Sequence, residues 1–393
     1  MTSSHRAIRS VVDHISHSPA RTDAMFATTT PACVSLRAAP ASTSRHTRAV
    51  VTPRASVEPS TTTTDRVTLG TSSLSVSATG VGAWAWGDRS GYWTDDWKGQ
   101  RVQNLEAYKT LLRGGVDFID TAEVYGFGKS EELLKDFSNE TLNDASLSRA
   151  LLATKFAPIP TRWTAEEVPK ALKASLDRLG AKKISLYMQH WPAFGWGADR
   201  NNDVFLEGLC MCYEQGLCDA VGVSNFNADR VKTAAKKFKQ RGVPFASNQV
   251  QYSLLYREPE TETGILEACF EHGVTPVAYS PMAQGLLTGK YSTGTTVKGP
   301  RSGIFTEGRL RDTESVIRTL KEVGDVHGKT PAQVAVNYCM SKNTVPIPGA
   351  KNKSQAESVI GCLGFRLSDS EIIELEKVAK KAPKSPGAPF EKW

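Results

Sequence analysis

The apolar runs VDFIDTA (116–122), LLATKFA (151–157) and ISLYMQHW (184–191) decide the fold of this chain. Each has the length of a buried strand and carries an ionisable residue near its C-terminal end. These residues, Asp120, Lys155 and His190, recur at equal intervals of about 35 residues, the length of one strand–helix unit. Side chains spaced in this way meet at one rim of a parallel barrel, where barrel active sites form.

The same pattern continues on both sides of these runs. Further strands are predicted at GVGAWAW (80–86), AVGVSNF (220–226), FASNQVQYS (245–253), TPVAYSPM (275–282) and VPIPGA (345–350). Helical patterns lie between the strands, at 101–113, 129–138, 165–179, 202–215, 228–241, 263–272, 313–328 with 331–342, and 353–363. Strands that alternate with helices indicate a parallel sheet, either a closed barrel or an open doubly wound sheet.

The first strand favours the closed barrel. An open dinucleotide-binding sheet carries G-x-G-x-x-G after its first strand, whereas GVGAWAWG (80–87) lacks the third Gly and does not lead into a helix. We therefore expect the α/β class and a (β/α)8 TIM barrel, with an N-terminal β-hairpin at Arg66–Ser77 and extra C-terminal helices. One of these covers Ser368–Lys381 and begins with a capping box. The long Gly-rich stretch 284–312 is expected to form a lid over a bound ligand.

The first 55 residues differ in composition from the rest. They are rich in Ser, Thr, Ala and Arg, with seven Arg, two Asp, no Glu and no Lys, as organellar transit peptides are. We expect residues 1–55 to be a disordered transit peptide, 56–65 a linker and 66–393 one barrel domain. The Ser/Thr content favours the chloroplast stroma, with the mitochondrion as second choice.

Charge and residue usage limit the partners. The formal net charge of +7 comes largely from the leader, so the body is close to neutral and we expect no nucleic-acid partner. Apolar runs of about 18 residues are lacking, so we expect no membrane span. Four His lie in the leader without periodicity, and no metal site is expected; they are His5, His14, His17 and His46. A monomer is favoured over an oligomer.

Cysteine spacing gives two readings. The cluster Cys210, Cys212 and Cys218 lacks the paired spacing of a zinc site. Reduced thiols in the core are the favoured interpretation, and a redox-regulated pair within 210–218 is the alternative.

Tyr125 is the candidate acid for carbonyl chemistry. Reduction of a carbonyl needs a hydride at carbon and a proton at oxygen. Tyr125 follows Asp120 in DTAEVYG (120–126), and a nearby ammonium, Lys155, would lower the pKa of its phenol. Asp120 would balance the charge of a buried Lys155, and His190 would donate to the substrate oxygen or share in proton delivery.

Six ordered motifs resemble the aldo-keto reductase family from about residue 66 to 381. They are FIDTAEVYGFGKSEELL (118–134), LLATKF (151–156), LYMQHWP (186–192), VGVSNF (221–226), NQVQYS (248–253) and IPGAKNKSQAES (347–358). The resemblance, of the plant or algal plastid type, implies an NADP(H)-dependent reductase of small aldehydes or ketones. It also implies a catalytic tetrad of Asp120, Tyr125, Lys155 and His190, with Tyr125 as the general acid.

The resemblance also implies a cofactor site for NADP(H). It places the nicotinamide carboxamide on amide and hydroxyl side chains, the ring against Tyr279, the pyrophosphate along a Gly-containing loop and the adenosine phosphate on Lys351 and Gln355. A basic residue is common in relatives where Gln355 stands, and Lys353 is a possible substitute. The expected cofactor contacts are Gly82, Ala83, Trp84, Asp120, Ser224, Asn225, Gln249, Tyr279, Ser280, Met282, Gly285, Leu286, Thr288, Gly349, Lys351 and Gln355.

The substrate pocket is expected to be apolar. Trp84, Tyr125, His190 and Trp191 are its predicted residues, and Trp86, Trp93 and Trp97 are further candidates. The sequence does not select among sugar aldehydes, lipid-peroxidation aldehydes, pyridoxal and ketones as candidate substrates.

Two alternatives stay open. A weakly catalytic or non-catalytic redox-sensing subunit shares the family's fold and cofactor, as the beta subunits of voltage-gated potassium channels do. A short-chain dehydrogenase would need Tyr-x-x-x-Lys, which Tyr125 and Lys129 match, but no dinucleotide fingerprint precedes them.

Overall fold

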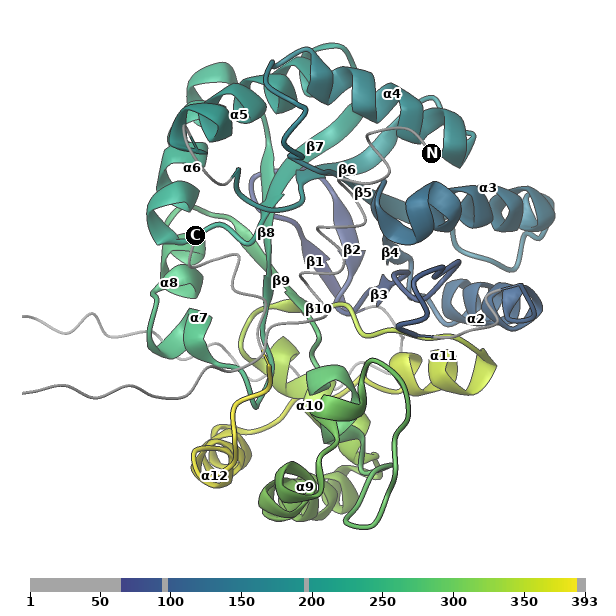
Figure 1. Cartoon of the computed structure of the whole chain (residues 1–393), viewed down its shortest axis with the longest axis vertical. Helices are drawn as coiled ribbons and strands as arrows, with labels where there is room; N and C mark the ends of the chain where they lie inside the picture. Colours follow the sequence, from purple (N-terminus) through teal and green to yellow (C-terminus); the bar gives the residue numbers. More distant parts are fainter. Residues whose placement is uncertain (1–64, 94–97, 194–197, 387–393) are drawn as a thin grey trace, which may run out of the picture.

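A parallel eight-stranded barrel forms the body of the protein (Figure 1). The computed structural model describes residues 65–93, 98–193 and 198–386, so the predicted transit peptide, the linker up to residue 64 and Trp97 lie outside the described residues. The strands are β3 (Val81–Gly82), β4 (Phe118–Asp120), β5 (Leu151–Phe156), β6 (Ile184–Gln189), β7 (Cys218–Ser224), β8 (Phe245–Gln251), β9 (Thr275–Tyr279) and β10 (Val345–Pro346). Each pairs in parallel with the next in sequence, and a bridge between Gly82 and Gly349 closes the ring. The predicted barrel is confirmed.

Helices surround the barrel. They are α2 (Arg101–Arg113), α3 (Lys129–Thr141), α4 (Glu167–Leu179), α5 (Ala198–Glu214), α6 (Ala228–Arg241), α7 (Glu258–Thr261), α8 (Ile265–Glu271), α9 (Glu307–His327), α10 (Pro331–Ser341), α11 (Lys353–Ile360) and α12 (Asp369–Ala379). The predicted extra C-terminal helix is α12, and Ser368 and Glu371 form its capping box. It packs beside α9, outside the ring of strands.

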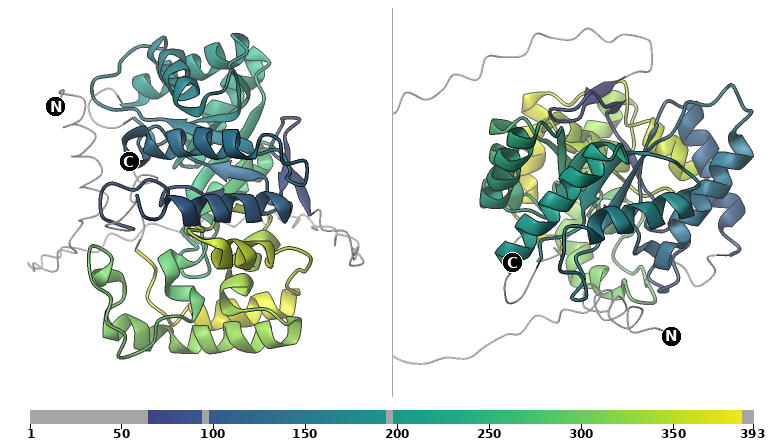
Figure 2. Two further views of the ribbon diagram at one scale, coloured as in Figure 1. Left: turned by 90° about the vertical axis from the view of Figure 1, so that its right-hand side faces the viewer. Right: turned by 90° about the horizontal axis from the view of Figure 1, so that it is seen from above.

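The predicted hairpin closes the N-terminal end of the barrel. β1 (Arg66–Thr68) and β2 (Ser75–Ser77) pair antiparallel, and Figure 2 shows them projecting at one end of the molecule. The backbone N–H of Thr71 donates to the carbonyl of Phe245, the first residue of β8, at 3.1 Å. Leu69 and Val76 join the cluster of apolar side chains that fills the barrel interior.

Alternation along the strands separates an apolar interior from a polar rim. Side chains two residues apart on a strand share one face. Phe118 therefore precedes Asp120, Ala153 precedes Lys155, and Val277 precedes Tyr279 on the inward face. The first member of each pair belongs to the buried interior cluster. The second lies at the C-terminal end, so the strands themselves deliver polar groups to that rim.

Several boundaries differ from the prediction. The first strand is limited to Val81–Gly82, because a turn follows in which Trp86 packs into the core against Tyr108 and Phe137. The irregular stretch for which a lid was predicted is shorter than residues 284–312, because Thr306 caps the start of α9 and residues 307–312 are helical. Within 283–304 the chain makes two short 3-10 turns, η2 (Ala283–Thr288) and η3 (Ser302–Ile304).

The cysteines of the described residues are buried and unpaired with one another. Burial raises the pKa of Cys210 to about 11 and that of Cys218 to about 12. Thiols that are shielded and protonated react poorly, which favours the core interpretation over a redox pair. In the described part of the chain, no helix combines the length and the apolar character needed to span a membrane.

Candidate active site

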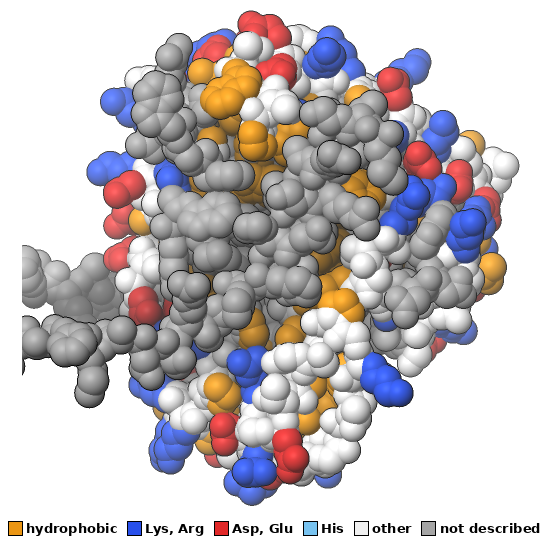
Figure 3. All heavy atoms as spheres, in the orientation of Figure 1, with side chains coloured by type: hydrophobic (Ala, Val, Ile, Leu, Met, Phe, Trp, Pro, Cys, Tyr) orange, Lys and Arg blue, Asp and Glu red, His pale blue; other side chains and the backbone are white. Residues whose placement is uncertain are grey.

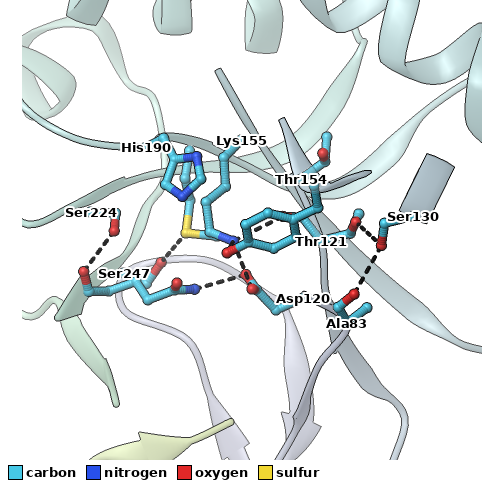
Figure 4. A network of polar contacts seen from close by, with 12 residues as sticks. Ala83, Asp120, Thr121, Ser130, Thr154, Lys155, His190, Ser224 and Ser247 are labelled. Atoms are coloured by element: carbon cyan, nitrogen blue, oxygen red, sulfur yellow. Dashed lines mark hydrogen bonds and ion pairs between the residues drawn. The ribbon is translucent and has the colours of Figure 1, made fainter. Parts of the chain in front are cut away.

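Lys155 is the centre of the polar group at the barrel rim. Its Nζ donates to Asp120 Oδ2 at 2.6 Å, to the carbonyl of Thr121 at 2.9 Å and to Tyr125 Oη at 3.2 Å. Figure 4 shows the Lys155 and Asp120 side chains pointing toward each other beneath His190. The three acceptors use all three hydrogens of the ammonium. Because Tyr125 Oη accepts from Lys155, its own hydrogen is left for another acceptor.

Burial dominates the ionisation of this group. Burial raises the pKa of Asp120 and lowers the pKa of Lys155, and the attraction between the two opposes both shifts. The pKa of Tyr125 lies well above its usual value. Burial is the largest cause, and electrostatic repulsion from Asp120 and then from Tyr279 adds to it. The prediction of a lowered Tyr125 pKa is therefore wrong for this structure, because burial dominates and the charge of Asp120 acts in the same direction. Tyr125 remains a protonated phenol.

His190 is neutral at ordinary pH. Burial, and secondarily the positive charge of Lys155, hold the pKa of its imidazole well below the usual value. Its ring lies edge-on to the ring of Tyr125, with centroids 5.6 Å apart. Its backbone carbonyl accepts a hydrogen bond from Asn225 Nδ2 at 3.0 Å. The imidazole is thus a neutral group beside the phenol.

A cavity of about 1150 Å³ opens over this group. On the face in Figure 3, hydrophobic side chains show near the centre of the molecule and charged ones at its periphery. Tyr125 and His190 line the cavity, whereas Lys155 is fully buried and does not. Most predicted cofactor residues also line it: Gly82, Trp84, Asp120, Ser224, Asn225, Gln249, Tyr279, Ser280, Met282, Gly285, Thr288, Gly349, Lys351 and Gln355.

Two predicted cofactor contacts have side chains that belong to the core. Ala83 is fully buried and Leu286 is 2% exposed, and both pack into the main apolar cluster. Ala83 instead offers its backbone carbonyl to the Ser130 hydroxyl. Their side chains therefore pack in the apolar core and do not line the cavity.

The amide and hydroxyl side chains of the rim bind one another. Gln249 Nε2 donates to Asp120 Oδ1 at 2.7 Å, and Tyr279 Oη donates to Asn225 Oδ1 at 3.0 Å. Ser224 Oγ donates to the Gln249 carbonyl at 2.8 Å. Asn225 Nδ2 also donates to Ser224 Oγ at 3.1 Å, so side chains at the ends of β4, β7, β8 and β9 are fixed in one hydrogen-bonded set with both donors and acceptors.

Three basic residues of the cavity wall were not predicted. Lys290, Arg301 and Arg309 line it together with the predicted Lys351. Burial, then Arg301 and Lys290, lower the pKa of Lys351. Arg309 Nη1 is buried without a hydrogen-bond partner in the described part of the chain. The concentration of basic residues in the lid sequence was the signal that could have identified them.

This basic cluster fits an anionic ligand. Four cations that share a cavity repel one another, and an anion removes both the repulsion and the unmet donor. Lys353, the predicted substitute for a basic residue at position 355, is 67% exposed in its side chain and pairs with Glu357. It does not line the cavity.

Aromatic side chains form the other part of the cavity wall. Trp84 stacks on Tyr92 at 5.3 Å between centroids and lies beside Tyr125 at 6.2 Å. Trp93 and Trp191 also line the cavity, as predicted, whereas Trp86 does not. Tyr92 also lines the cavity. It was not predicted, although it directly precedes the predicted Trp93 in the sequence.

The strand ends of this parallel barrel converge on a buried Asp–Lys pair, a phenol and an imidazole. Active sites of barrel enzymes form at this C-terminal rim. Residues 78–380 match the model of the aldo/keto reductase family. The chain belongs to the aldo/keto reductase family, a family of oxidoreductases.

Named relatives support this membership. The chain is 40% identical over 321 residues to pyridoxal reductase, chloroplastic, of Arabidopsis thaliana, covering 79% of this chain and 86% of the relative. It is 27% identical to the aldo-keto reductase yakc (NADP+) of Schizosaccharomyces pombe, covering 68% and 80%. Among solved structures, the thermostable aldo-keto reductase Tm1743 with the inhibitor epalrestat matches with a TM-score of 0.61 at 27% identity, covering 80% and 99%.

Proposed function

We propose that the protein is an NADPH-dependent reductase of small aldehydes or ketones, with pyridoxal as the first candidate substrate. The observation that carries the proposal is the protonated Tyr125 phenol, which accepts from Lys155 at 3.2 Å and lines the cavity. The aromatic wall suits a flat, largely apolar substrate. The relative named pyridoxal reductase supports pyridoxal within that class.

Each member of the tetrad has a proposed role. Tyr125 gives its proton to the carbonyl oxygen as negative charge develops there. Lys155 stabilises the phenolate that forms, and Asp120 holds Lys155 in place. His190, which is neutral, donates a hydrogen bond to the same oxygen and orients the carbonyl. NADPH, when bound, supplies the hydride to the carbonyl carbon.

The residues of the cavity fit NADPH. The hydrogen-bonded set of Ser224, Asn225 and Gln249 offers donors and acceptors for the carboxamide, and Tyr279 offers a ring face. Backbone N–H groups around η2, where Gln284 and Gly285 have positive φ, suit the pyrophosphate. The basic cluster suits the phosphates, and the unmet donor of Arg309 indicates that an anion belongs there.

Turnover of NADPH is the test of this proposal. The purified full chain should oxidise NADPH when pyridoxal is added. The loss of reduced-nicotinamide absorbance measures this reaction. A panel of benzaldehydes, sugar aldehydes and ketones establishes the substrate class. Tight binding of NADPH without turnover across this panel would overturn the enzyme proposal in favour of a redox-sensing subunit.

Lys351 should set the preference for NADPH over NADH. A hydrogen bond to a charged group contributes about 1.5–3 kcal/mol, so Lys351→Ala should lower the ratio of kcat/KM for NADPH to that for NADH by about tenfold or more. Lys353→Ala, which alters an exposed Lys on α11, is the matched control and should leave the ratio unchanged. An unchanged ratio in Lys351→Ala would assign the phosphate to Arg301 or Arg309.

We also propose plastid targeting by residues 1–55. The composition of that segment and the relative named as chloroplastic support the proposal. Radiolabelled full-length protein should enter isolated chloroplasts and lose the leader. Import into mitochondria instead would select the second location.

A further inference from the structure

We propose that Ser130 and Glu131, in the first turn of α3, are positioning residues that hold the Tyr125 turn against β4 and β5 and so set the contact between Tyr125 and Lys155. The inference rests on the proposed function, in which Tyr125 is the acid. It goes further by assigning a role to two buried residues that the mechanism does not use.

Tyr125 needs such an anchor because of where it lies. Asp120 and Lys155 are strand residues, and His190 directly follows β6. Tyr125 instead opens the short turn η1 (Tyr125–Gly128), between β4 and α3. A turn is held less firmly than a strand paired on both sides. The distance from Tyr125 to Lys155 therefore depends on what fixes the turn.

The turn itself has an unusual backbone. Gly126, Phe127 and Gly128 have φ of 56°, 58° and 91°. A left-handed residue other than Gly costs about 1 kcal/mol or more and persists where its surroundings enforce it. A Cβ on Gly126 would lie 2.1 Å from the carbonyl oxygen of Gly87, and one on Gly128 would lie 2.8 Å from Arg178 Cδ. The turn is thus packed closely between the backbone of Gly87, which follows β3, and the side chain of Arg178 on α4.

Ser130 ties the start of α3 to two strand ends. It is fully buried; its Oγ accepts from Thr121 Oγ1 at 2.8 Å and donates to the carbonyl of Ala83 at 3.1 Å. The carbonyl of Thr121 also accepts from Lys155 Nζ at 2.9 Å. As Figure 4 shows, one short chain of contacts joins Ser130, Thr121 and the Lys155 ammonium.

Glu131 ties the same helical turn to β5 and α4. Its carboxylate is fully buried and accepts from Thr154 Oγ1 at 2.6 Å and from Arg178 Nε at 2.6 Å. Thr154 directly precedes Lys155, so the hydrogen bond from Thr154 to Glu131 fixes α3 next to the strand residue that carries the ammonium. Arg178, held by Glu131, is also the side chain that packs against Gly128.

These contacts form one bracket around the reaction centre. Ser130 fixes α3 to the ends of β3 and β4, and Glu131 fixes it to β5 and, through Arg178, to the turn. A displacement of a reacting group by about 1 Å can cost about 10²-fold in rate. Loosening the bracket should therefore lower kcat without removing any group from the cavity.

Thr154 offers the cleanest test, because its two variants differ by one hydroxyl. Thr154→Val removes the hydrogen bond to Glu131 and keeps the β-branched shape, and Thr154→Ser keeps the hydroxyl. We expect Thr154→Val to lower kcat by about tenfold, and Thr154→Val combined with Ser130→Ala by about 10²-fold. KM for NADPH should stay within about twofold of wild type, and Thr154→Ser should retain wild-type kcat. Glu132→Gln, on the exposed face of the same turn, is the matched control and should also match wild type.

Hydrogen exchange gives a readout independent of turnover. In Thr154→Val, backbone amides of 124–129 should exchange faster, while those of α6 remain as in wild type. Wild-type kcat in the double variant, or an equal loss in Thr154→Ser, would overturn the inference. A wild-type enzyme without activity would instead refute the proposed function. In that case the exchange experiment alone decides the role of the bracket. Faster exchange of residues 124–129 in Thr154→Val would support it, and unchanged exchange would refute it.

Discussion

Tyr125→Phe should lower kcat for carbonyl reduction by about 10²–10⁴-fold, the usual contribution of a general acid. The substitution removes the hydroxyl that accepts from Lys155 at 3.2 Å, on a residue that lines the cavity. The ring remains, so its packing beside Trp84 is kept. Binding of NADPH should stay within about twofold of wild type, because the basic cluster and the amide set are untouched.

The measurement pairs steady-state kinetics with NADPH fluorescence titration. Tyr108→Phe is the matched control, because Tyr108 is buried between α2 and α3 and its hydroxyl contacts Ser138, away from the cavity. That variant should keep wild-type kcat. A Tyr125→Phe enzyme that keeps more than about a tenth of wild-type kcat would move the proton donor to His190, and His190→Phe would then show the large loss.

The rim could be predicted from sequence because strands impose a strict order. Once Asp120, Lys155 and His190 are placed at the ends of consecutive parallel strands, period-2 alternation and a common direction leave one edge at which they can meet. The structure brings them together there. The hairpin and α12 were predicted from local signals of another kind, such as the capping box that Ser368 and Glu371 form at the start of α12.

Loop contributions could not be predicted in this way. Tyr92 and Arg301 reach the cavity through turns whose course depends on tertiary contacts, such as the hydrogen bond from Tyr92 Oη to Gln284 Oε1 at 2.5 Å, and Arg309 reaches it from the first turn of α9. The ionisation of Tyr125 was misjudged for a related reason. The sequence places a cation near the phenol, but the pKa of the phenol also depends on its burial and on the charge of Asp120, and both raise it.

Lys155→Met should destabilise the fold by about 3–5 kcal/mol, the cost of leaving one partner of a buried ion pair without the other. Lys155 is fully buried and the Asp120 side chain is 2% exposed, so little water reaches the carboxylate when the ammonium is removed. The double variant Asp120→Asn/Lys155→Met should be much closer to wild type, because neutral groups of similar shape often replace buried pairs at little cost. Urea unfolding monitored by circular dichroism measures both.

The pH dependence separates a lost charge from a lost contact. In Lys155→Met the Asp120 carboxyl keeps the effect of burial, which raises its pKa, and loses the ammonium that opposed it. The folded state then binds a proton more readily than the unfolded state, so the stability of Lys155→Met falls as pH rises above about 4, the pKa of Asp in unfolded chains.

The destabilisation by Lys155→Met should accordingly be larger at pH 7.5 than at pH 5, and the double variant should lack this difference. Lys183→Met, which breaks an exposed pair with Asp219, is the matched control and should cost at most about 1 kcal/mol. Equal losses in Lys155→Met at the two pH values would show that packing, not the buried charge of Asp120, sets the cost. In that case the ion pair would serve the chemistry of Tyr125 without stabilising the barrel, and the double variant would gain nothing over the single one.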